Sequence, residues 1–314
     1  MDFPKHEQRG ETTSPFLEER GISPILFTFG GLFLILVLYQ VVGGAITFII
    51  IGNPVTANVN GLRLMTMITQ LTFMLLPALL LTKVLTNRMG TFYGWRIPSL
   101  FEVAITLLAL FALMQLGQIY ITLQSLIPLP EPLKGLMDQF QRMVEQAYRM
   151  IVAVESPLEL LWVVLIVAFT PAIVEEVTFR GFAYGGLLQR FNPRTTVILT
   201  GIVFALFHGN PFALVPLSAL GIFFGFLRLR SMSIILPMTA HFANNVAAIL
   251  AYYFGFSESL AGSVVPEDIE PGLLLQTGLL WLSVLIMALY VYVRITDSLH
   301  HSPDDLGGKN EMNG

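Results

Sequence analysis

Long apolar segments constrain the fold of this chain more than any other feature. A helix that crosses a membrane needs about 20 mostly apolar residues. Segments close to that length occur at about 25–51, 62–86, 101–127, 158–190, 194–208, 211–227, 234–255 and 272–294. Of the 314 residues, 54% are hydrophobic and only 12% are charged, which lies outside the range of soluble domains. We therefore predict an all-α, polytopic membrane protein with about eight transmembrane helices.

A further helix is predicted between the third and fourth spans. In residues 131–155, apolar residues such as Leu133, Leu136 and Phe140 recur at helical spacing, and charged residues such as Asp138 lie between them. This pattern is typical of an amphipathic helix that lies in the membrane interface. The fourth span is longer than a bilayer requires, and the fifth and sixth are short.

Basic residues mark every second loop and the end of the last span. They are Lys83, Arg88, Arg96, Arg190, Arg194, Arg228, Arg230 and Arg294. The positive-inside rule places these loops, and with them both termini, in the cytosol. We therefore expect a cytosolic tail at 1–24, one integral-membrane domain at 25–294 and a second cytosolic tail at 295–314. The membrane would be the plasma membrane in a prokaryote and the endoplasmic reticulum in a eukaryote.

Charge and cysteine content exclude several function classes. The formal net charge is −4 and the basic residues are scattered, so no nucleic-acid partner is expected, and the lipid bilayer is the first partner. The chain has no cysteine, which excludes disulfides, thiolate nucleophiles and cysteine-rich metal sites.

Two acids and one arginine interrupt the fourth apolar segment. Glu175 and Glu176 follow a stretch that is apolar apart from Glu159, and Arg180 lies four residues beyond Glu176. An ionisable group at such depth costs about 2.5–3.5 kcal/mol on insertion scales and marks a candidate functional site. Glu176 and Arg180 are spaced to form an ion pair on one helix face. Glu175 has no cation nearby in the sequence, so its partner must come from another helix.

Three polar clusters can meet at one depth. If Asn192 and Pro193 form the turn of a helical hairpin, Glu175 and His208 both lie roughly 24 Å from that turn at 1.5 Å per residue. The seventh span places His241 and Asn245 about 15 and 21 Å from the same side. Phe204 and His208 share one helix face, as do His241 and Asn245. We therefore predict that these helices converge on one buried polar site.

Two chemistries suit such a site, and both predict amide hydrolysis. In the first, Glu175 is the general base for a water, His208 assists it, and His241 and Asn245 donate hydrogen bonds to the oxyanion. In the second, Glu175, His208 and His241 bind a zinc ion that activates the water. The two differ in whether a metal is required.

These clusters resemble the three motifs of the CAAX prenyl endopeptidase and bacteriocin-processing family, also called CPBP or Abi. Glu-Glu-x-x-x-Arg matches Glu175, Glu176 and Arg180; Phe-x-x-x-His matches Phe204 and His208; His-x-x-x-Asn matches His241 and Asn245. The resemblance covers roughly 158–255 and identifies that stretch as the motif-bearing core. Each motif is weak alone, but three in order on membrane helices make a specific signal.

The resemblance implies an eight-span membrane protease that cleaves near the C-terminus of a membrane-associated protein or peptide, with prenylated proteins among the candidate substrates. It implies Glu175 as base, His208 as its partner, and His241 with Asn245 as oxyanion donors. Glu176 and Arg180 would support the site, with substrate binding by Arg180 as the second option. The family has been described both as metal-dependent and as glutamate-dependent. We favour the metal-free mechanism because Asn245 is a natural oxyanion donor and a poor zinc ligand.

Two other functions fit the same residues. A non-catalytic membrane scaffold or bacteriocin-immunity protein would keep them as a structural hydrogen-bond network. A proton-coupled transporter could use buried Glu and His as a relay, but it would usually show repeated halves, and no repeat is present in the sequence.

Overall fold

A computed structural model of the chain describes residues 15–52, 58–128, 130–255 and 270–297. Within these ranges the protein is all-α and contains no strand, as predicted. Residues 1–14 and 298–314, which make up most of the two predicted tails, lie outside the described residues. The part of the N-terminal tail that is described holds a short helix, α1 (Pro15–Glu19), which packs against α5 (Leu76–Leu85) and buries Leu17.

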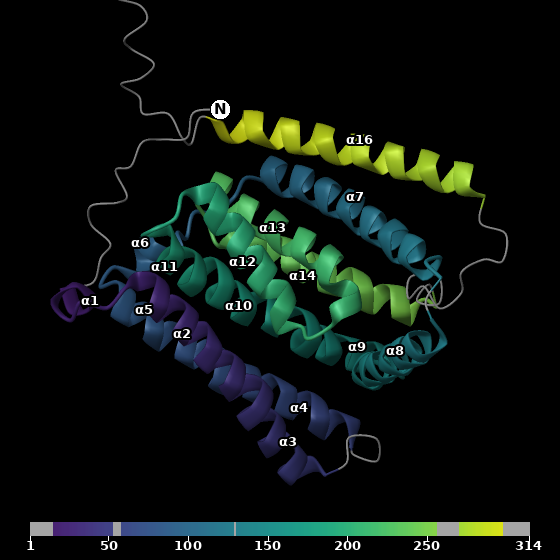
Figure 1. Cartoon of the computed structure of the whole chain (residues 1–314), viewed down its shortest axis with the longest axis horizontal. Coiled ribbons are helices and arrows are strands. Elements are labelled where there is room, and N and C mark those ends of the chain that lie inside the picture. Colours follow the sequence, from purple (N-terminus) through teal and green to yellow (C-terminus); the bar gives the residue numbers. More distant parts are fainter. Residues whose placement is uncertain (1–14, 53–57, 129, 256–269, 298–314) are drawn as a thin grey trace, which may run out of the picture.

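The first two spans form a hairpin of two long helices, which packs against the fourth span and projects from the molecule at one end (Figure 1). Each is an α-helix interrupted by a π-helical segment. The first comprises α2 (Pro24–Leu36), a π-helical turn at Val37–Gly43 and α3 (Gly44–Ile51). The second comprises α4 (Val59–Gln70), a π-helical turn at Leu71–Leu75 and α5 (Leu76–Leu85). Asn58 caps α4 by accepting hydrogen bonds from the N–H groups of Asn60 and Gly61.

The motif-bearing helices form the centre of the molecule (Figure 1). The fourth span runs from Pro157 to Leu188 as α9 (Pro157–Val163), α10 (Thr170–Glu176) and α11 (Tyr184–Leu188), with π-helical segments between them. It is followed by α12 (Pro193–Phe207), α13 (Leu214–Ser231) and α14 (Ile235–Tyr253). The Asn192 side chain caps α12 by accepting a hydrogen bond from Thr195 N–H at 2.9 Å, so the predicted hairpin turn is confirmed.

Glycine lets α12 and α13 approach closely. A Cβ atom on Gly201 would lie 2.6 Å from the backbone nitrogen of Ile222, and one on Gly221 would lie 2.6 Å from the carbonyl oxygen of Gly201. No side chain fits at either position without moving a helix. Small residues at helix crossings are common in membranes for this reason.

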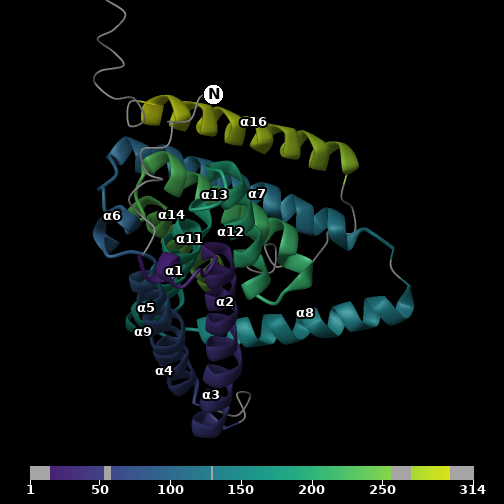
Figure 2. The same ribbon diagram turned by 60° about the vertical axis from the view of Figure 1, so that its left-hand side comes forward.

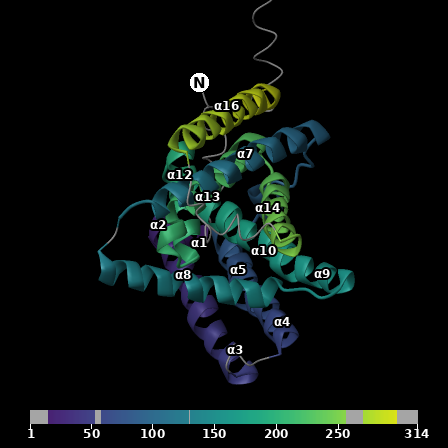
Figure 3. The same cartoon turned by 90° about the vertical axis from the view of Figure 1, so that its right-hand side faces the viewer.

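The third and eighth spans pack together as an outer layer. They are α7 (Leu100–Ser125) and α16 (Pro271–Thr296), which lie side by side across the central helices in Figures 1 and 3. Ser99 and Glu102 start α7 with a reciprocal capping box. The outward face of α16 is almost wholly apolar, as expected for a helix that contacts lipid.

The predicted amphipathic helix is present as α8 (Glu131–Val152). Figures 2 and 3 show it lying crosswise to the first hairpin, whereas in Figure 1 it is seen end-on. Its C-terminal end is fixed by buried Arg63 of α4, whose guanidinium donates to the carbonyl oxygens of Ile151 and Ala153 and to Glu159. Tyr148 packs on Tyr252, and burial there raises the pKa of Tyr148 to about 12.

All eight predicted spans are helices, with ends that differ by only a few residues from those predicted. Six of them, among the described residues, are long and apolar enough to cross a membrane. The other two are α12, which has 15 residues, and α14, whose polar side chains lower its hydropathy. Both belong to the motif-bearing core. The structure therefore supports a polytopic membrane protein with at least six such helices.

Candidate active site

The helix that carries the two acids changes its winding on both sides of them. A π-helical segment at Val164–Phe169 precedes α10 (Thr170–Glu176), and another at Val177–Ala183 follows it. Pro171 has no N–H group and cannot continue regular α-helical hydrogen bonding, which explains the first irregularity. Short π-helical segments occur frequently at functional sites. Glu175 and Glu176 lie in α10 between these segments, where consecutive side chains point about 100° apart and so face different neighbours.

Glu176 and Arg180 form a fully buried ion pair. Arg180 Nη1 donates to Glu176 Oε1 at 2.9 Å, and both side chains have 0% exposure. Arg180 Nη2 donates to the carbonyl oxygen of Gly221 on α13 at 2.7 Å. The guanidinium carbon also lies 4.7 Å from the ring centre of Phe204 and 5.2 Å from that of Phe224. Arg180 is thus enclosed by protein atoms and holds α10 against α13.

His241 joins this buried pair to the rest of the site. Its Nδ1 lies 2.9 Å from Glu176 Oε1, so this nitrogen carries the proton and donates to the carboxylate. The imidazole stacks on Phe224 with ring centres 5.0 Å apart and contacts Phe204 edge-on. With Nδ1 held in this way, only Nε2 of His241 points toward Glu175.

His208, on another helix, is also held through Nδ1, so that its Nε2 faces Glu175. It forms the C-cap of α12, and its Nδ1 lies 2.8 Å from the carbonyl oxygen of Phe204. That carbonyl can only accept, so Nδ1 donates and Nε2 faces Glu175. The His208 side chain is 33% exposed, compared with 4% for His241. His208 therefore forms the accessible side of the site.

Glu175 lies between the two imidazoles. Its Oε2 is 4.0 Å from His208 Nε2 and 3.9 Å from His241 Nε2. These distances are too long for hydrogen bonds but short enough for one water to contact both groups. Glu175 Oε2 is buried and has no hydrogen-bond partner among the described residues. The predicted convergence of Glu175, His208 and His241 is confirmed, and the side chains that face Glu175 come from other helices.

Asn245 lies one turn beyond His241 on α14. Its carbonyl oxygen accepts a hydrogen bond from Asn244 Nδ2 at 3.2 Å. Within the described part of the chain, no hydrogen bond joins Asn245 to Glu175, His208 or His241. A carbonyl oxygen only accepts, so the group of Asn245 that can donate to a substrate oxygen is its NH₂.

Glu175, His208 and His241 are also the residues that could hold a metal ion. Tetrahedral zinc ligands at about 2.0–2.2 Å from the ion lie roughly 3.3–3.6 Å from each other. The oxygen-to-nitrogen distances here are 3.9 and 4.0 Å. No group of three or more His, Asp or Glu side chains in the described ranges is placed to hold a metal. The three side chains would have to move closer together before they could enclose zinc.

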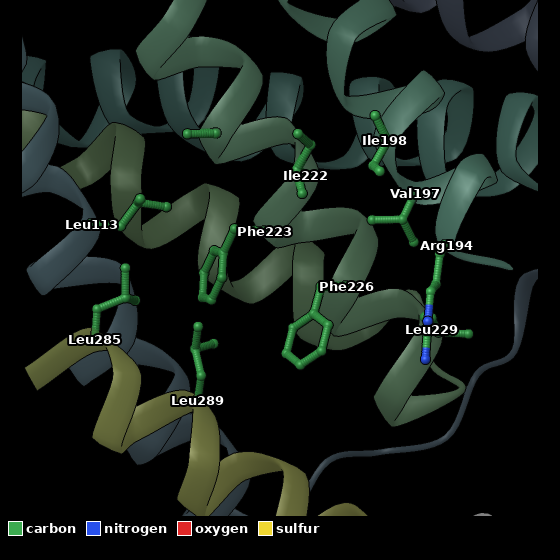
Figure 4. A pocket seen from close by; sticks show the side chains of 11 residues that line it. Leu113, Arg194, Val197, Ile198, Ile222, Phe223, Phe226, Leu229, Leu285 and Leu289 are labelled. Atoms are coloured by element: carbon green, nitrogen blue, oxygen red, sulfur yellow. The ribbon is translucent and has the colours of Figure 1, made fainter. Parts of the chain in front are cut away.

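An apolar groove lies on the opposite face of α13. It has a volume of about 490 Å³, and its lining includes Phe223, Phe226 and Leu289, with Arg194 at one end (Figure 4). None of the motif residues lines it. The groove therefore does not mark the site of the chemistry, although α13 is a wall that both share.

The motifs did not reveal every residue of the site. Gly221 and Phe224 of α13 belong to no motif, yet one bonds Arg180 through its carbonyl oxygen and the other stacks on His241. A main-chain acceptor has no signature in a sequence. The Gly221-x-x-x-Gly225 spacing does predict close helix packing, but it does not indicate which helix approaches.

Comparison with known proteins identifies a matching protein family. Residues 157–247 match the family model described as "Rce1-like: Type II CAAX prenyl endopeptidase Rce1-like". The matched stretch runs from the start of α9 into α14 and contains all three motifs. No curated protein and no solved structure matches the chain.

Proposed function

We propose that this chain is a metal-free, glutamate-dependent membrane endopeptidase, since residues 157–247 match the Rce1-like CAAX prenyl endopeptidase family model. The observation that carries this proposal is the position of Glu175 Oε2, which is buried, has no partner in the described structure and lies about equally far from two imidazole nitrogens. Its substrate would be a membrane-associated protein or peptide, cleaved near its C-terminus, with prenylated proteins as the first candidates.

The reacting water would lie between Glu175 and His208. A carboxylate and the unprotonated Nε2 of His208 are both acceptors, and a water can donate one hydrogen to each. When the water attacks the substrate carbonyl, Glu175 takes one of its protons. Glu175 then delivers that proton to the leaving amine as the carbon–nitrogen bond breaks.

His241 and Asn245 would stabilise the oxyanion. With both imidazoles neutral, Glu175, Glu176 and Arg180 give the site a net charge of −1. A proton on Nε2 of His241 makes the site neutral, and Glu176 already accepts from the other nitrogen of the same ring at 2.9 Å. In that state His241 donates to the developing oxyanion, together with the NH₂ group of Asn245.

Glu176 and Arg180 would act as positioning residues. Arg180 has 0% exposure and both of its terminal nitrogens are engaged by protein acceptors, which supports a structural role over binding of a substrate carboxylate. The ion pair would hold the His241 ring in place, because Glu176 Oε1 accepts from both side chains.

The test compares membranes from cells that express wild-type protein, Glu175→Gln or Glu145→Gln at matched levels. Glu145 is a suitable control because it forms an exposed ion pair with Arg149 on α8. Peptide mapping should find new protein termini with wild type and Glu145→Gln that disappear with Glu175→Gln. Identical termini with all three proteins would favour the scaffold or immunity function.

Metal dependence needs a separate measurement on purified protein. We expect less than stoichiometric zinc by elemental analysis and no loss of cleavage after dialysis against a chelator. Stoichiometric zinc that is lost together with activity, and restored with it, would overturn the metal-free mechanism.

A further inference from the structure

The first hairpin, which precedes the matched segment, also brings polar side chains to the site. Gln40 Nε2 donates to the carbonyl oxygen of Phe207 at 3.0 Å, one residue before His208. Its neighbour Tyr39 contacts Gln70, with 3.4 Å between Gln70 Nε2 and the Tyr39 hydroxyl oxygen. Gln70 ends α4, and Tyr39 and Gln40 lie in the π-helical turn at Val37–Gly43. The hairpin thus reaches the last turn of α12.

Gln70 belongs to α4, which packs against the segment that carries Glu175, and Tyr39 belongs to the π-helical turn that packs against α4. The segment α10, which carries Glu175, packs against α4 and against the π-helical turn at Leu71–Leu75 that directly follows Gln70. A Coulombic interaction with the Glu175 carboxylate also acts on the Tyr39 hydroxyl. The pair therefore belongs to the helices that pack around the Glu175 segment, although no motif contains either residue.

The hydrogen bonds of this pair are incomplete. Gln70 is 7% exposed, and its Oε1 is buried without a partner among the described residues. The Tyr39 oxygen accepts from Gln70, so its own O–H hydrogen remains available for another acceptor. A buried acceptor without a partner costs free energy, and a pair with only a packing role would be expected to avoid that cost. Together they offer one donor and one acceptor, side by side.

We propose that Tyr39 and Gln70 bind the main chain of the substrate in an extended conformation beside Glu175. Tyr39 donates to a carbonyl oxygen and Gln70 Oε1 accepts from the N–H of the same substrate residue. In an extended chain these two groups of one residue point to the same side, as they do in an antiparallel sheet. The inference rests on the proposed peptidase function and extends it to how the substrate is held.

This mode of binding requires that the bound segment of the substrate is not helical. A helical segment has already used its N–H and C=O groups on itself, so it offers nothing to Tyr39 and Gln70. Only an unwound or C-terminal segment can pair with them. Recognition of the main chain also places few limits on the side chain of the bound residue.

The experiment measures cleavage by purified full-length protein of an internally quenched peptide that ends in a farnesylated CAAX sequence. Tyr39→Phe and Gln70→Met each remove hydrogen-bonding groups at nearly constant volume. We expect each to lower kcat/KM about 10-fold, mainly through KM, as for loss of one hydrogen bond to a bound substrate. Tyr290→Phe and Gln276→Met, at exposed positions of α16, are the matched controls and should behave as wild type.

Backbone N-methylation of the probe separates substrate contact from a structural effect. A single N-methyl group outside the scissile bond, at the residue that Gln70 binds, should weaken cleavage by wild type about 10-fold. The same substrate should lose no further activity with Gln70→Met, because the contact is already missing. Purely additive losses at every position would show that Gln70 acts through structure alone and would overturn the inference.

Failure of the inference and failure of the proposed function give different results. Wild-type rates for Tyr39→Phe and Gln70→Met, beside an inactive Glu175→Gln, would overturn only the inference. If the farnesylated peptide is not cleaved, the same variants are compared in membranes. There we measure how fast the Glu175-dependent protein termini form, and wild-type rates for Tyr39→Phe and Gln70→Met would again overturn the inference. If wild type and Glu175→Gln gave the same protein termini, the proposed peptidase function itself would be overturned.

Discussion

Glu175 and Glu176 are neighbours in the sequence but lie in two different environments. Glu176 has 0% exposure, and its Oε1 accepts from Arg180 and His241 at 2.9 Å each. Glu175 is 16% exposed and faces His208 and His241 at about 4 Å without a hydrogen bond to either. We call Glu176, Arg180 and His241 the closed half of the site, because hydrogen bonds join them. Glu175 and His208 form the open half, where the spacing leaves room for a water.

The largest expected effect is that of Glu175→Gln on activity. The amide keeps the shape of the side chain but cannot take a proton from water, so we expect a loss of about 10³–10⁴-fold in kcat. Because Glu175 has no hydrogen-bond partner in the described structure, the thermal stability of the purified protein should stay within a few degrees of wild type. Retained activity would show that the open half does not carry the chemistry.

The opposite profile is expected for Arg180→Met. Removing the guanidinium leaves Glu176 as a buried charge without its cation and breaks the hydrogen bond to the Gly221 carbonyl oxygen. The free energy of unfolding should therefore fall by about 3–5 kcal/mol. The measurement is thermal denaturation in detergent, followed by cleavage assays at a temperature where the variant stays folded. A stable Arg180→Met protein with lost substrate binding would instead support a direct contact between Arg180 and the substrate.

His208 is more exposed than Glu175 and Arg180, and its substitution should lower activity less than that of Glu175 and stability less than that of Arg180. His208→Gln removes the ring nitrogen that faces Glu175, and we expect kcat to fall about 10²-fold with little change in stability, since the ring is 33% exposed. His241→Gln should lower both activity and stability, because His241 also contacts Glu176 and Phe224. If His208→Gln and His241→Gln lost equal stability, the open half would be as important for stability as the closed half, which contradicts the division.

Much of this arrangement was predictable from helical periodicity. The hairpin turn at Asn192, the ion pair between Glu176 and Arg180, and the meeting of Glu175 with two histidines follow from counting residues along helices. The orientation of each imidazole was not predictable, because it depends on how a helix is rotated about its axis and on which acceptor the rotation presents. The carbonyl of Gly221 and the Tyr39–Gln70 pair depend on tertiary packing and leave no local sequence pattern.

The number of predicted spans depends on how strictly length and hydropathy are applied. Apolar stretches of roughly membrane length predicted all eight helices, whereas a stricter combination of length and mean hydropathy is met by six of the described helices and not by α12 and α14. These two helices carry His208 at the C-cap and His241 with Asn245 within the helix, and the polar side chains of α14 lower its average hydropathy. A helix that builds a polar site in a membrane can thus fail the test that identifies its neighbours.

The smallest effect is expected where the closed half depends on helix contact alone. In Gly201→Ala, the new Cβ would meet Ile222 N and Gly221 C at 2.6 and 2.9 Å, so α12 and α13 must separate slightly. Overpacking of this kind costs about 1–3 kcal/mol. Because Gly221 also accepts from Arg180, the shift should weaken the buried network and leave the open half intact.

The matched control is Gly30→Ala in α2, where a Cβ meets nothing within 4 Å. This substitution should be neutral or slightly stabilising. Thermal denaturation of the two variants tests this directly: equal stabilities would mean that close contact between α12 and α13 is not what supports the ion pair.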